Sequence, residues 1–427
     1  MATLAEVPRP GAAPSEASPD PAPGPAPARR RARRAWLLAH RWLGLTAGLV
    51  FVLLGLTGSL LVFYPRLDAL ADPAHVVASG GRRVALGAIV AAARAAHRGT
   101  AEPTWILAPD VASGAYVVRF DEPRGARGEV DAVWAAVDPA TGRAMGERVW
   151  GRTAASWVYE LHSTLRLGDA GETTVGAVGL LVLLSLGSGA YLWWPAVRAN
   201  ARRALAVPWR AGGARRTRDL HNAGGVYPGV VLLALALSGA YLVFAGRVDP
   251  VVGRVARITP YPGGLASTPR PGAPPISPDQ AVAAAARAVP GGELRYLALP
   301  AGPAGVYWVI TRPLGETGRK RAQSHVWVDQ YTGRVLAVRD WRRATAADRV
   351  LGSMLPVHNG ELLGTPGRWA VAAAGVAPLL LYVTGARMWW RKRRGRRRRE
   401  RRPARDAARS GGPTASAAWS GRAPPAT

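Results

Sequence analysis

The chain has 427 residues, no cysteine, and 56 Lys and Arg against 27 Asp and Glu, giving a formal net charge of +29. This length exceeds what a single soluble core usually holds. The lack of cysteine excludes disulfides, cysteine-ligated iron–sulfur clusters and covalently attached c-type haem. The densest basic clusters, Arg29–Arg34, Arg198–Arg218 and Arg391–Arg402, each abut an apolar run of membrane-spanning length. Such placement is typical of a membrane protein and argues against nucleic acid as the partner.

Residues 1–35 are rich in Pro, Ala and Arg, and we expect a disordered cytoplasmic tail. The first transmembrane helix is predicted over residues 36–64. It holds His40-Arg-Trp-Leu-Gly and an uninterrupted apolar run of 21 residues from Leu43 to Phe63. At 1.5 Å rise per residue such a run crosses a hydrocarbon core of roughly 30 Å. We interpret it as retained, because it is too long, and its leader too extended, for a cleaved signal peptide.

Residues 65–160 form a hydrophilic unit with a predicted helix at 84–97 and short strands at 104–108, 115–120 and 133–137. Asp138-Pro-Ala-Thr-Gly-Arg143 predicts a chain reversal. Residues 161–198 then combine an interfacial helix near His162 with a second span. A basic cytoplasmic loop follows at 199–220.

The third span is predicted at residues 221–246, and a second hydrophilic unit at 247–357. This unit repeats the first, with a helix at 277–289, strands at 294–299, 306–311 and 325–328, and the turn Asp329-Gln-Tyr-Thr-Gly-Arg334. Residues 358–392 hold an interfacial segment and the fourth span. A basic disordered tail is expected at 393–427.

The chain therefore contains two similar halves, residues 36–198 and 217–392, each with two histidine-led spans around an α+β unit. The predicted fold class is an integral membrane protein with four transmembrane helices in a parallel tandem repeat and two extracytoplasmic α+β domains. A parallel repeat implies a pseudo-two-fold axis along the membrane normal. That axis pairs His40 with His221 at the cytoplasmic side, and His162 with His358 at the outer side. Two imidazoles facing each other are the axial ligand set of a b-type haem, so two non-covalent haems are predicted.

Single interfacial histidines are more often polar anchors, and only the repeated pairing favours iron ligation. Gly44 and Gly225 each follow a histidine by four residues on the same helical face. They either leave room for a flat macrocycle or allow close contact between helices, and both interpretations stay open. Four arginines near the histidines are candidates to bind haem propionates: Arg41, Arg166, Arg218 and Arg368. His75, His97 and His325 lie in the hydrophilic units and are expected to be exposed or capping residues.

Several stretches together resemble the PepSY-associated transmembrane-helix family over about residues 36–392. They are His-Arg-Trp-Leu-Gly-Leu (40–45), Asp-Pro-Ala-Thr-Gly-Arg (138–143), Glu-Leu-His-Ser-Thr-Leu (160–165), Gly-Ala-Tyr-Leu-Trp-Trp-Pro (189–195), Asp-Leu-His (219–221) and Val-His-Asn-Gly (357–360). The third span departs from the pattern, since His-Asn-Ala-Gly-Gly replaces His-Arg-Trp-Leu-Gly. The resemblance implies a bacterial inner-membrane, iron-regulated protein with PepSY-like periplasmic domains and cytoplasmic termini. Some family members resemble di-haem ferric-siderophore reductases, and the four paired histidines are the positions that inherit ligand roles.

The leading hypothesis is electron transfer across the bilayer to a periplasmic acceptor, a ferric siderophore, which would make the chain a haem-dependent reductase. No nicotinamide or ATP motif is present, so the electron donor is external, either quinol or a cytoplasmic flavoprotein. No catalytic residue set is recognisable in the outer units. The alternative is a non-redox protein: a membrane-anchored PepSY binding or inhibitory module, or an accessory subunit of iron uptake. Anchoring needs only one helix and gives no reason for paired histidines.

Overall fold

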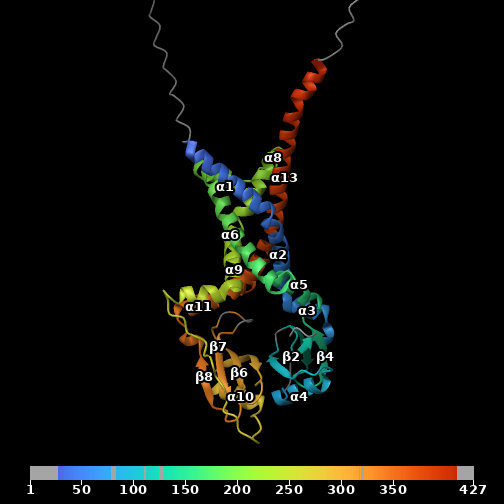
Figure 1. The fold of residues 1–427 in the computed structure, drawn as a ribbon, viewed down its shortest axis with the longest axis vertical. Coiled ribbons are helices and arrows are strands. Elements are labelled where there is room, and N and C mark those ends of the chain that lie inside the picture. Colours follow the sequence, from blue (N-terminus) through green and yellow to red (C-terminus); the bar gives the residue numbers. More distant parts are fainter. Residues whose placement is uncertain are drawn as a thin grey trace, which may run out of the picture.

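The computed structural model combines a long helical bundle with an eight-stranded antiparallel sheet at one end (Figure 1). It describes residues 27–77, 83–109, 112–124, 129–316, 318 and 322–410. Among these, three helices are long and apolar enough to cross a membrane, and a fourth candidate is a bent helix pair. We call the end of the bundle next to the sheet the sheet end. The other end, where α1 begins and α13 leaves the bundle, is the terminal end.

The first span is broken. Helix α1 covers Pro27–Leu45 and α2 covers Ala47–Leu61, with a bend of 48° between them. The second half repeats this break: α8 (Gly213–Val226) is followed by Tyr227-Pro228 and then α9 (Gly229–Val252). The first span, predicted at residues 36–64, is therefore a bent helix pair. The third, predicted at residues 221–246, begins within α8 and continues in α9, which alone is long and apolar enough to cross a membrane. His40 and His221 lie on α1 and α8, ahead of the breaks.

The second and fourth spans are the longest apolar helices. Helix α6 covers Gly168–Ala199, and α13 covers Gly364–Ser410. Each half makes the same contacts: α1 packs on α6 and α8 on α13, while α6 also crosses α9 and α13 crosses α2. At the α2–α13 crossing the backbones of Gly55 and Gly375 touch, and Ser59 donates a hydrogen bond to the carbonyl of Ala372 at 2.8 Å. Such glycine contacts permit close helix approach where lipid offers no hydrophobic drive.

Both predicted tails are partly helical. Helix α1 already begins at Pro27, so residues 27–35 do not belong to an irregular segment. Helix α13 continues to Ser410, well past the predicted boundary at residue 393. Arginine is a good helix former, so α1 and α13 can include arginine-rich sequence that is not apolar. The remainder of both predicted tails, residues 1–26 and 411–427, lies outside the described residues.

The outer region of each half is a helix followed by four strands. In the first half these are α4 (Leu86–Ala96), β1 (Pro103–Leu107), β2 (Tyr116–Arg124), β3 (Glu129–Val137) and β4 (Ala144–Val149). In the second they are α10 (Pro278–Ala288), β5 (Gly292–Ala298), β6 (Val306–Pro313), β7 (Ser324–Asp329) and β8 (Val335–Arg339). The fourth strand of each set was not predicted. It follows the expected turn, in which Asp138 or Asp329 accepts hydrogen bonds from the next backbone amides.

The two outer units form one body. The strand order is β4-β3-β2-β1-β5-β6-β7-β8, so β1 of the first half pairs with β5 of the second. Helices α4 and α10 cover the same face, and a single hydrophobic core joins Ile106, Phe120 and Leu297 across the β1–β5 seam. The prediction of two separate outer domains is therefore corrected to one shared sheet. Alternating apolar residues specify the buried face of a strand but not the partner at its edge.

Candidate functional site

The structure places the four predicted histidines in two pairs, one near each end of the bundle. The ring centres of His40 and His221 are 6.2 Å apart, and those of His162 and His358 are 6.1 Å apart. His162 lies on α5 (Ala154–Thr164) and His358 on α12 (Met354–His358), both at the sheet end. Each pair thus takes one imidazole from each half. A metal held between two imidazole nitrogens at about 2 Å each puts the ring centres roughly 6 Å apart.

Each histidine is oriented through its Nδ1 atom by a hydroxyl on another helix of its own half. The hydrogen-bond partners are Ser188 for His40 (3.0 Å), Thr384 for His221 (2.9 Å), Thr57 for His162 (3.0 Å) and Ser238 for His358 (3.1 Å). For His40 and His358, the carbonyl three residues before the hydroxyl also accepts from Nδ1, at 3.1 Å for both Ser185 and Leu235.

These partners fix which ring nitrogen carries the proton. A carbonyl oxygen can only accept, so the Nδ1 atom that faces Ser185 or Leu235 must donate. The hydroxyls use their own protons elsewhere: Thr57 donates to Leu53 at 2.8 Å and Thr384 to Leu380 at 2.6 Å. They too therefore accept from Nδ1. The neutral imidazole then has a bare lone pair on Nε2, and no described residue hydrogen-bonds to that atom in any of the four. A metal-binding histidine has this arrangement.

A glycine follows every one of these hydroxyl residues. A Cβ atom added at Gly58 or Gly239 would lie 2.9 Å from Cε1 of the outer histidine it faces, and one at Gly189 would lie 3.1 Å from Cε1 of His40. At Gly385 the corresponding distance to His221 is 3.5 Å, an ordinary contact. The Cε1 edge of each histidine ring therefore packs against the backbone of a glycine, which has no side chain to obstruct it. Sequence reasoning did not connect this motif with the histidines, although Thr-Gly or Ser-Gly occurs at matching positions of all four spans.

The glycines that were predicted, Gly44 and Gly225, have different surroundings. A Cβ at Gly44 would meet no described atom within 4 Å, and one at Gly225 would meet only Leu381 at 3.8 Å. Gly44 therefore makes no close helix contact within the described residues, so the helix-packing interpretation finds no support there. Space beside a flat macrocycle stays a prediction for both. The close contact in α8 belongs to Gly224, which faces Leu380.

The four predicted arginines fall into two groups. Arg166 pairs with Glu160 at 3.1 Å, and Arg368 pairs with Glu361 at 3.0 Å. Arg41, beside His40, has a buried Nε atom with no hydrogen-bond partner among the described residues. The described residues provide no ion pair for Arg218 either. A buried unpaired donor is costly, so Arg41 fits an anionic group at the terminal-end pair. At the other pair, the buried Nδ2 of Asn359 is similarly unpartnered within the described chain.

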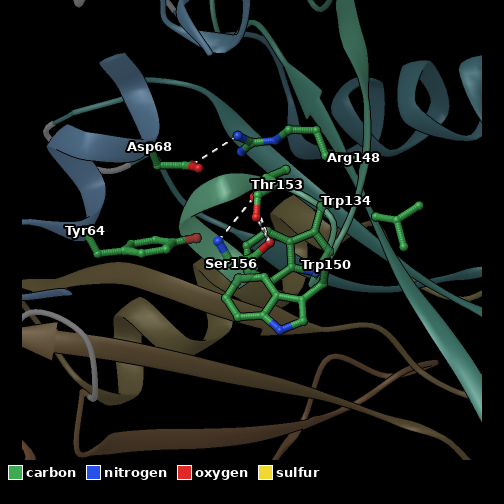
Figure 2. Close-up of a pocket in the computed structure, with 8 residues that line it drawn as sticks. Tyr64, Asp68, Trp134, Arg148, Trp150, Thr153 and Ser156 are labelled. Atoms are coloured by element: carbon green, nitrogen blue, oxygen red, sulfur yellow. Dashed lines mark hydrogen bonds and ion pairs between the residues drawn. The ribbon is translucent and has the colours of Figure 1, made fainter. Parts of the chain in front are cut away.

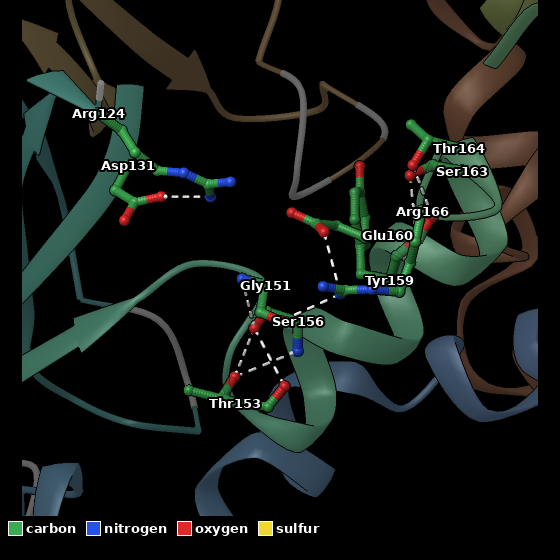
Figure 3. Close-up of polar contacts among 10 residues, drawn as sticks. All are labelled: Arg124, Asp131, Gly151, Thr153, Ser156, Tyr159, Glu160, Ser163, Thr164 and Arg166. Carbon is green, nitrogen blue, oxygen red and sulfur yellow. Dashed lines mark hydrogen bonds and ion pairs between the residues drawn. The ribbon is translucent and has the colours of Figure 1, made fainter. Parts of the chain in front are cut away.

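Helix α5, which carries His162, is fixed at both ends by its own flanking residues (Figure 3). Thr153 caps the first turn by accepting from the amide of Ser156, whose hydroxyl accepts from the amide of Gly151. The chain leaves the helix through Leu165 and Arg166, both in the left-handed region. Arg166 then reaches back to the carbonyl of Gly151 at 3.1 Å. One side chain thus ties the exit of α5 to its entrance.

A small cavity lies where the first span meets the sheet (Figure 2). It measures about 10 Å³, the space of one water molecule, and is lined by Tyr64 and Asp68 of α3 (Tyr64–Ala71) together with Trp134, Arg148 and Trp150. Arg148 of β4 pairs with Asp68 at 3.0 Å. The buried Nε1 of Trp134 has no hydrogen-bond partner in the described structure. This joint connects α3 to the sheet beside the first turn of α5.

The second half holds α12 in a different way. Asp348 of α11 (Ala346–Gly352) caps its own helix with Thr345 and accepts from both the amide and the hydroxyl of Thr259. Arg339 of β8 pairs with the same carboxylate at 3.0 Å. Burial opposes ionisation of Asp348, but the hydrogen bonds with Thr259 and Thr345 outweigh it and lower its pKa to about 2. The carboxylate links the sheet, the preceding linker and the helices that lead to His358.

His97 and His325, which belong to neither pair, interact with side chains of the sheet region. His97 follows the last residue of α4, as expected of a capping residue, and contacts Glu122 at 2.7 Å and Glu147 at 2.5 Å. His325 is buried in β7 and accepts from the Trp308 indole at 3.0 Å, so the expected exposure is wrong. Throughout the described part of the chain, no group of three or more His, Asp or Glu side chains could hold a metal ion. Each pair brings together two imidazoles and no third such side chain among the described residues, so a metal held there would need further donors from a cofactor.

Comparison with known proteins identifies the chain at the level of a family. A family described as the PepSY-associated TM region matches residues 37–392. The match spans both pairs of histidines, the broken helices and the whole sheet. A search of curated proteins finds no match. The chain therefore belongs to the PepSY-associated transmembrane family and is a membrane protein.

Proposed function

We propose that this protein is a di-haem b electron-transfer protein of the bacterial inner membrane. The observation that carries the proposal is the pairing of four imidazoles at 6.1–6.2 Å between ring centres, each with a bare Nε2. His40 and His221 would ligate one iron, and His162 and His358 the other. Bound haem supplies reversible one-electron chemistry at its iron.

The chain's own residues would hold and orient these groups. Backbone carbonyls and hydroxyls keep each Nδ1 protonated, which leaves the lone pair on Nε2. Arg41 offers a buried donor to a propionate at the inner site, and Asn359 offers one at the outer site. The match of contacts between halves supports a four-helix tandem repeat. Basic clusters at the terminal end support cytoplasmic termini and a periplasmic sheet with PepSY-like character.

Electrons would enter at the cytoplasmic pair from an external donor, either quinol or a cytoplasmic flavoprotein, and leave at the outer pair. The acceptor we propose is a ferric siderophore, in which each ferric ion takes up one electron. Hard oxygen ligands hold ferrous iron less tightly, so reduction favours release of the metal. The protein would act as a haem-dependent reductase whose potentials are set by hydrogen bonding and burial around the histidines.

Absorption spectroscopy of the purified, detergent-solubilised protein tests the proposal. The expected result is a Soret band that shifts on dithionite reduction and two haems per chain. His40→Ala and His358→Ala should each lower this ratio to one, because each removes one ligand of a different pair. His75→Ala is the control, since His75 belongs to neither pair. A protein without a reducible Soret band, or unchanged spectra in both ligand variants, would refute the haem proposal.

The acceptor is tested separately. Protein reduced under anaerobic conditions should be reoxidised on mixing with a ferric siderophore, and the same siderophore loaded with redox-inert gallium should have no effect. A haem-containing protein that ferric siderophores cannot reoxidise would leave electron transfer intact but refute siderophore iron as the acceptor.

One observation favours a second candidate, a PepSY binding module. A cleft of about 520 Å³ lies beside the shared sheet, lined by Val90, Pro278, Leu299 and Tyr307 among others. Its volume lies in the range of small-molecule and short-peptide sites. Purified protein that lacks haem but binds a peptidase or peptide would favour this function over the redox one.

A further inference from the structure

The four Ser/Thr–Gly dipeptides form one recurring arrangement. They are Thr57-Gly58 in α2, Ser188-Gly189 in α6, Ser238-Gly239 in α9 and Thr384-Gly385 in α13. The hydroxyl of each accepts from a histidine Nδ1 at 2.9–3.1 Å, and the glycine faces Cε1 of the same ring. Every hydroxyl of the set therefore orients a ring, and the glycines at 58, 189 and 239 also lie in close contact with that ring.

We propose that these dipeptides are positioning residues that lock the four histidines in the Nδ1–H form and set the electron affinity of the sites they form. The inference rests on the proposed haem function and names residues that do not touch the metal. Two observations support it independently. The hydroxyl protons are already donated to backbone carbonyls, so each hydroxyl can only accept from Nδ1. A methyl group would lie 2.9 Å from the histidine ring at Gly58 and Gly239, closer than non-bonded atoms pack, and 3.1 Å from it at Gly189.

The hydroxyl contact has an electronic consequence. An imidazole whose Nδ1–H is donated to an acceptor becomes a more basic ligand at Nε2. A more basic ligand stabilises the ferric over the ferrous form, so the hydrogen bond lowers the midpoint potential. Removing it from one ligand should therefore raise the midpoint potential of that site. Thr57 contributes to the outer site through His162, whereas Thr384 contributes to the inner site through His221.

The hydroxyl test uses Thr57→Val, which removes the acceptor but keeps the shape of the side chain. In a potentiometric titration of the full chain, we expect the midpoint of one haem to rise while the other stays in place. A rise of about 59 mV would correspond to a tenfold change in the ferrous-to-ferric ratio for a one-electron couple. Thr57→Ser restores the hydroxyl and should restore the midpoint. Thr384→Val should move the other transition instead.

The glycine test uses the different distances between an added methyl group and the histidine ring at the four glycines. A methyl group at Gly58 would lie 2.9 Å from Cε1 of His162, closer than non-bonded atoms pack, so the ring must move. Gly58→Ala should lower occupancy of the outer haem or shift its spectrum. Gly385→Ala, where the corresponding distance to His221 is 3.5 Å, should disturb the inner haem less than Gly58→Ala disturbs the outer one. Gly187→Ala is a further control, because no described atom lies within 4 Å of its added methyl.

The outcomes separate this inference from the proposed function. A wild-type protein with two reducible haems, whose midpoints and occupancy stay the same in both Thr57→Val and Gly58→Ala, would overturn the positioning role while electron transfer stands. A wild-type protein without haem would overturn the proposed function itself. Equal loss of haem in Gly58→Ala and Gly187→Ala would also overturn the inference, since a contact with the ring would then not be the cause.

Discussion

At the scale of single residues, two buried carboxyl groups of the second half have pKa values shifted in opposite directions. Asp348 has backbone, hydroxyl and guanidinium donors around it, and its pKa falls to about 2. Glu316 follows β6 and accepts from the amide of Gln323, but its Oε2 is buried without a hydrogen-bond partner among the described residues. Burial therefore raises the pKa of Glu316 to about 7. The folded chain therefore favours the protonated, neutral form of Glu316 over the ionised form.

Glu316 should consequently make stability depend on pH. The folded pKa lies above the ordinary 4.5, so its contribution is fully present below pH 4.5 and is lost as pH rises through 7. Glu316→Gln keeps the neutral shape and should avoid that loss, with a gain over the wild type of up to about 3 kcal/mol at about pH 8 and little change at about pH 4.5. Thermal unfolding in detergent at both pH values measures it. Glu102→Gln, at an exposed ion pair, is the control. An equal effect of Glu316→Gln at both pH values would contradict the assignment.

The pairing of the four histidines could be predicted from the sequence, but their hydrogen-bond partners could not. Their pairing follows from the similarity of the halves, because equivalent positions meet near a two-fold axis. Their ligand role stays a prediction. The hydroxyl partners were missed because Thr57 and His162 are 105 residues apart, and only the packing of α2 against α5 brings them together. Arg166 and Arg368 were proposed for propionates from proximity alone. Neighbouring glutamates pair with them, and a sequence does not reveal which of two nearby anions an arginine chooses.

At the scale of elements, the helix breaks are the main departure from the sequence prediction. An apolar run shows where lipid can surround the chain, but it does not show where the axis bends. In α9, Pro228 precedes the first residue, which gives a physical cause for the break, since proline cannot continue the backbone hydrogen bonding. The α1–α2 bend at Thr46 has no such marker. Strand β4 was missed because Ala144–Val149 lacks apolar alternation. Strand β8, Val335–Arg339, is a short apolar run that directly follows the predicted turn and was not assigned.

Helix α5 provides a test of how an element is held. Arg166→Ala removes the ion pair with Glu160 and the bond to the carbonyl of Gly151, while the left-handed backbone at this position remains unfavourable for alanine. We expect a loss of roughly 1–3 kcal/mol. Arg152→Ala removes an exposed arginine from its ion pair with Asp131 and should change stability by less than about 1 kcal/mol. Thermal unfolding of both variants in detergent makes the comparison, and equal losses would mean that Arg166 acts only as a surface charge.

At the scale of the whole molecule, the seam between β1 and β5 turns the outer region into a single cooperative unit. Ile106 is fully buried in the seam, opposite Leu297 of the other half. Ile106→Ala should cost about 2–5 kcal/mol, as for other large-to-small changes in a core. Hydrogen exchange of the full chain should then accelerate in both β3 and β7. Leu70→Ala, at an exposed position, is the control. Faster exchange confined to β1–β4 would indicate two independent domains.

The crossed origin of the histidine pairs has a structural consequence. Each ring is oriented by a hydroxyl from its own half but meets a ring from the other half. Two copies of one half, arranged as a symmetric dimer, would create the same pair of sites with identical ligand surroundings. Joining the halves in one polypeptide removes that constraint. Serine orients one imidazole of each pair and threonine orients the other. In a dimer of identical subunits, both imidazoles of a pair would have the same hydroxyl partner.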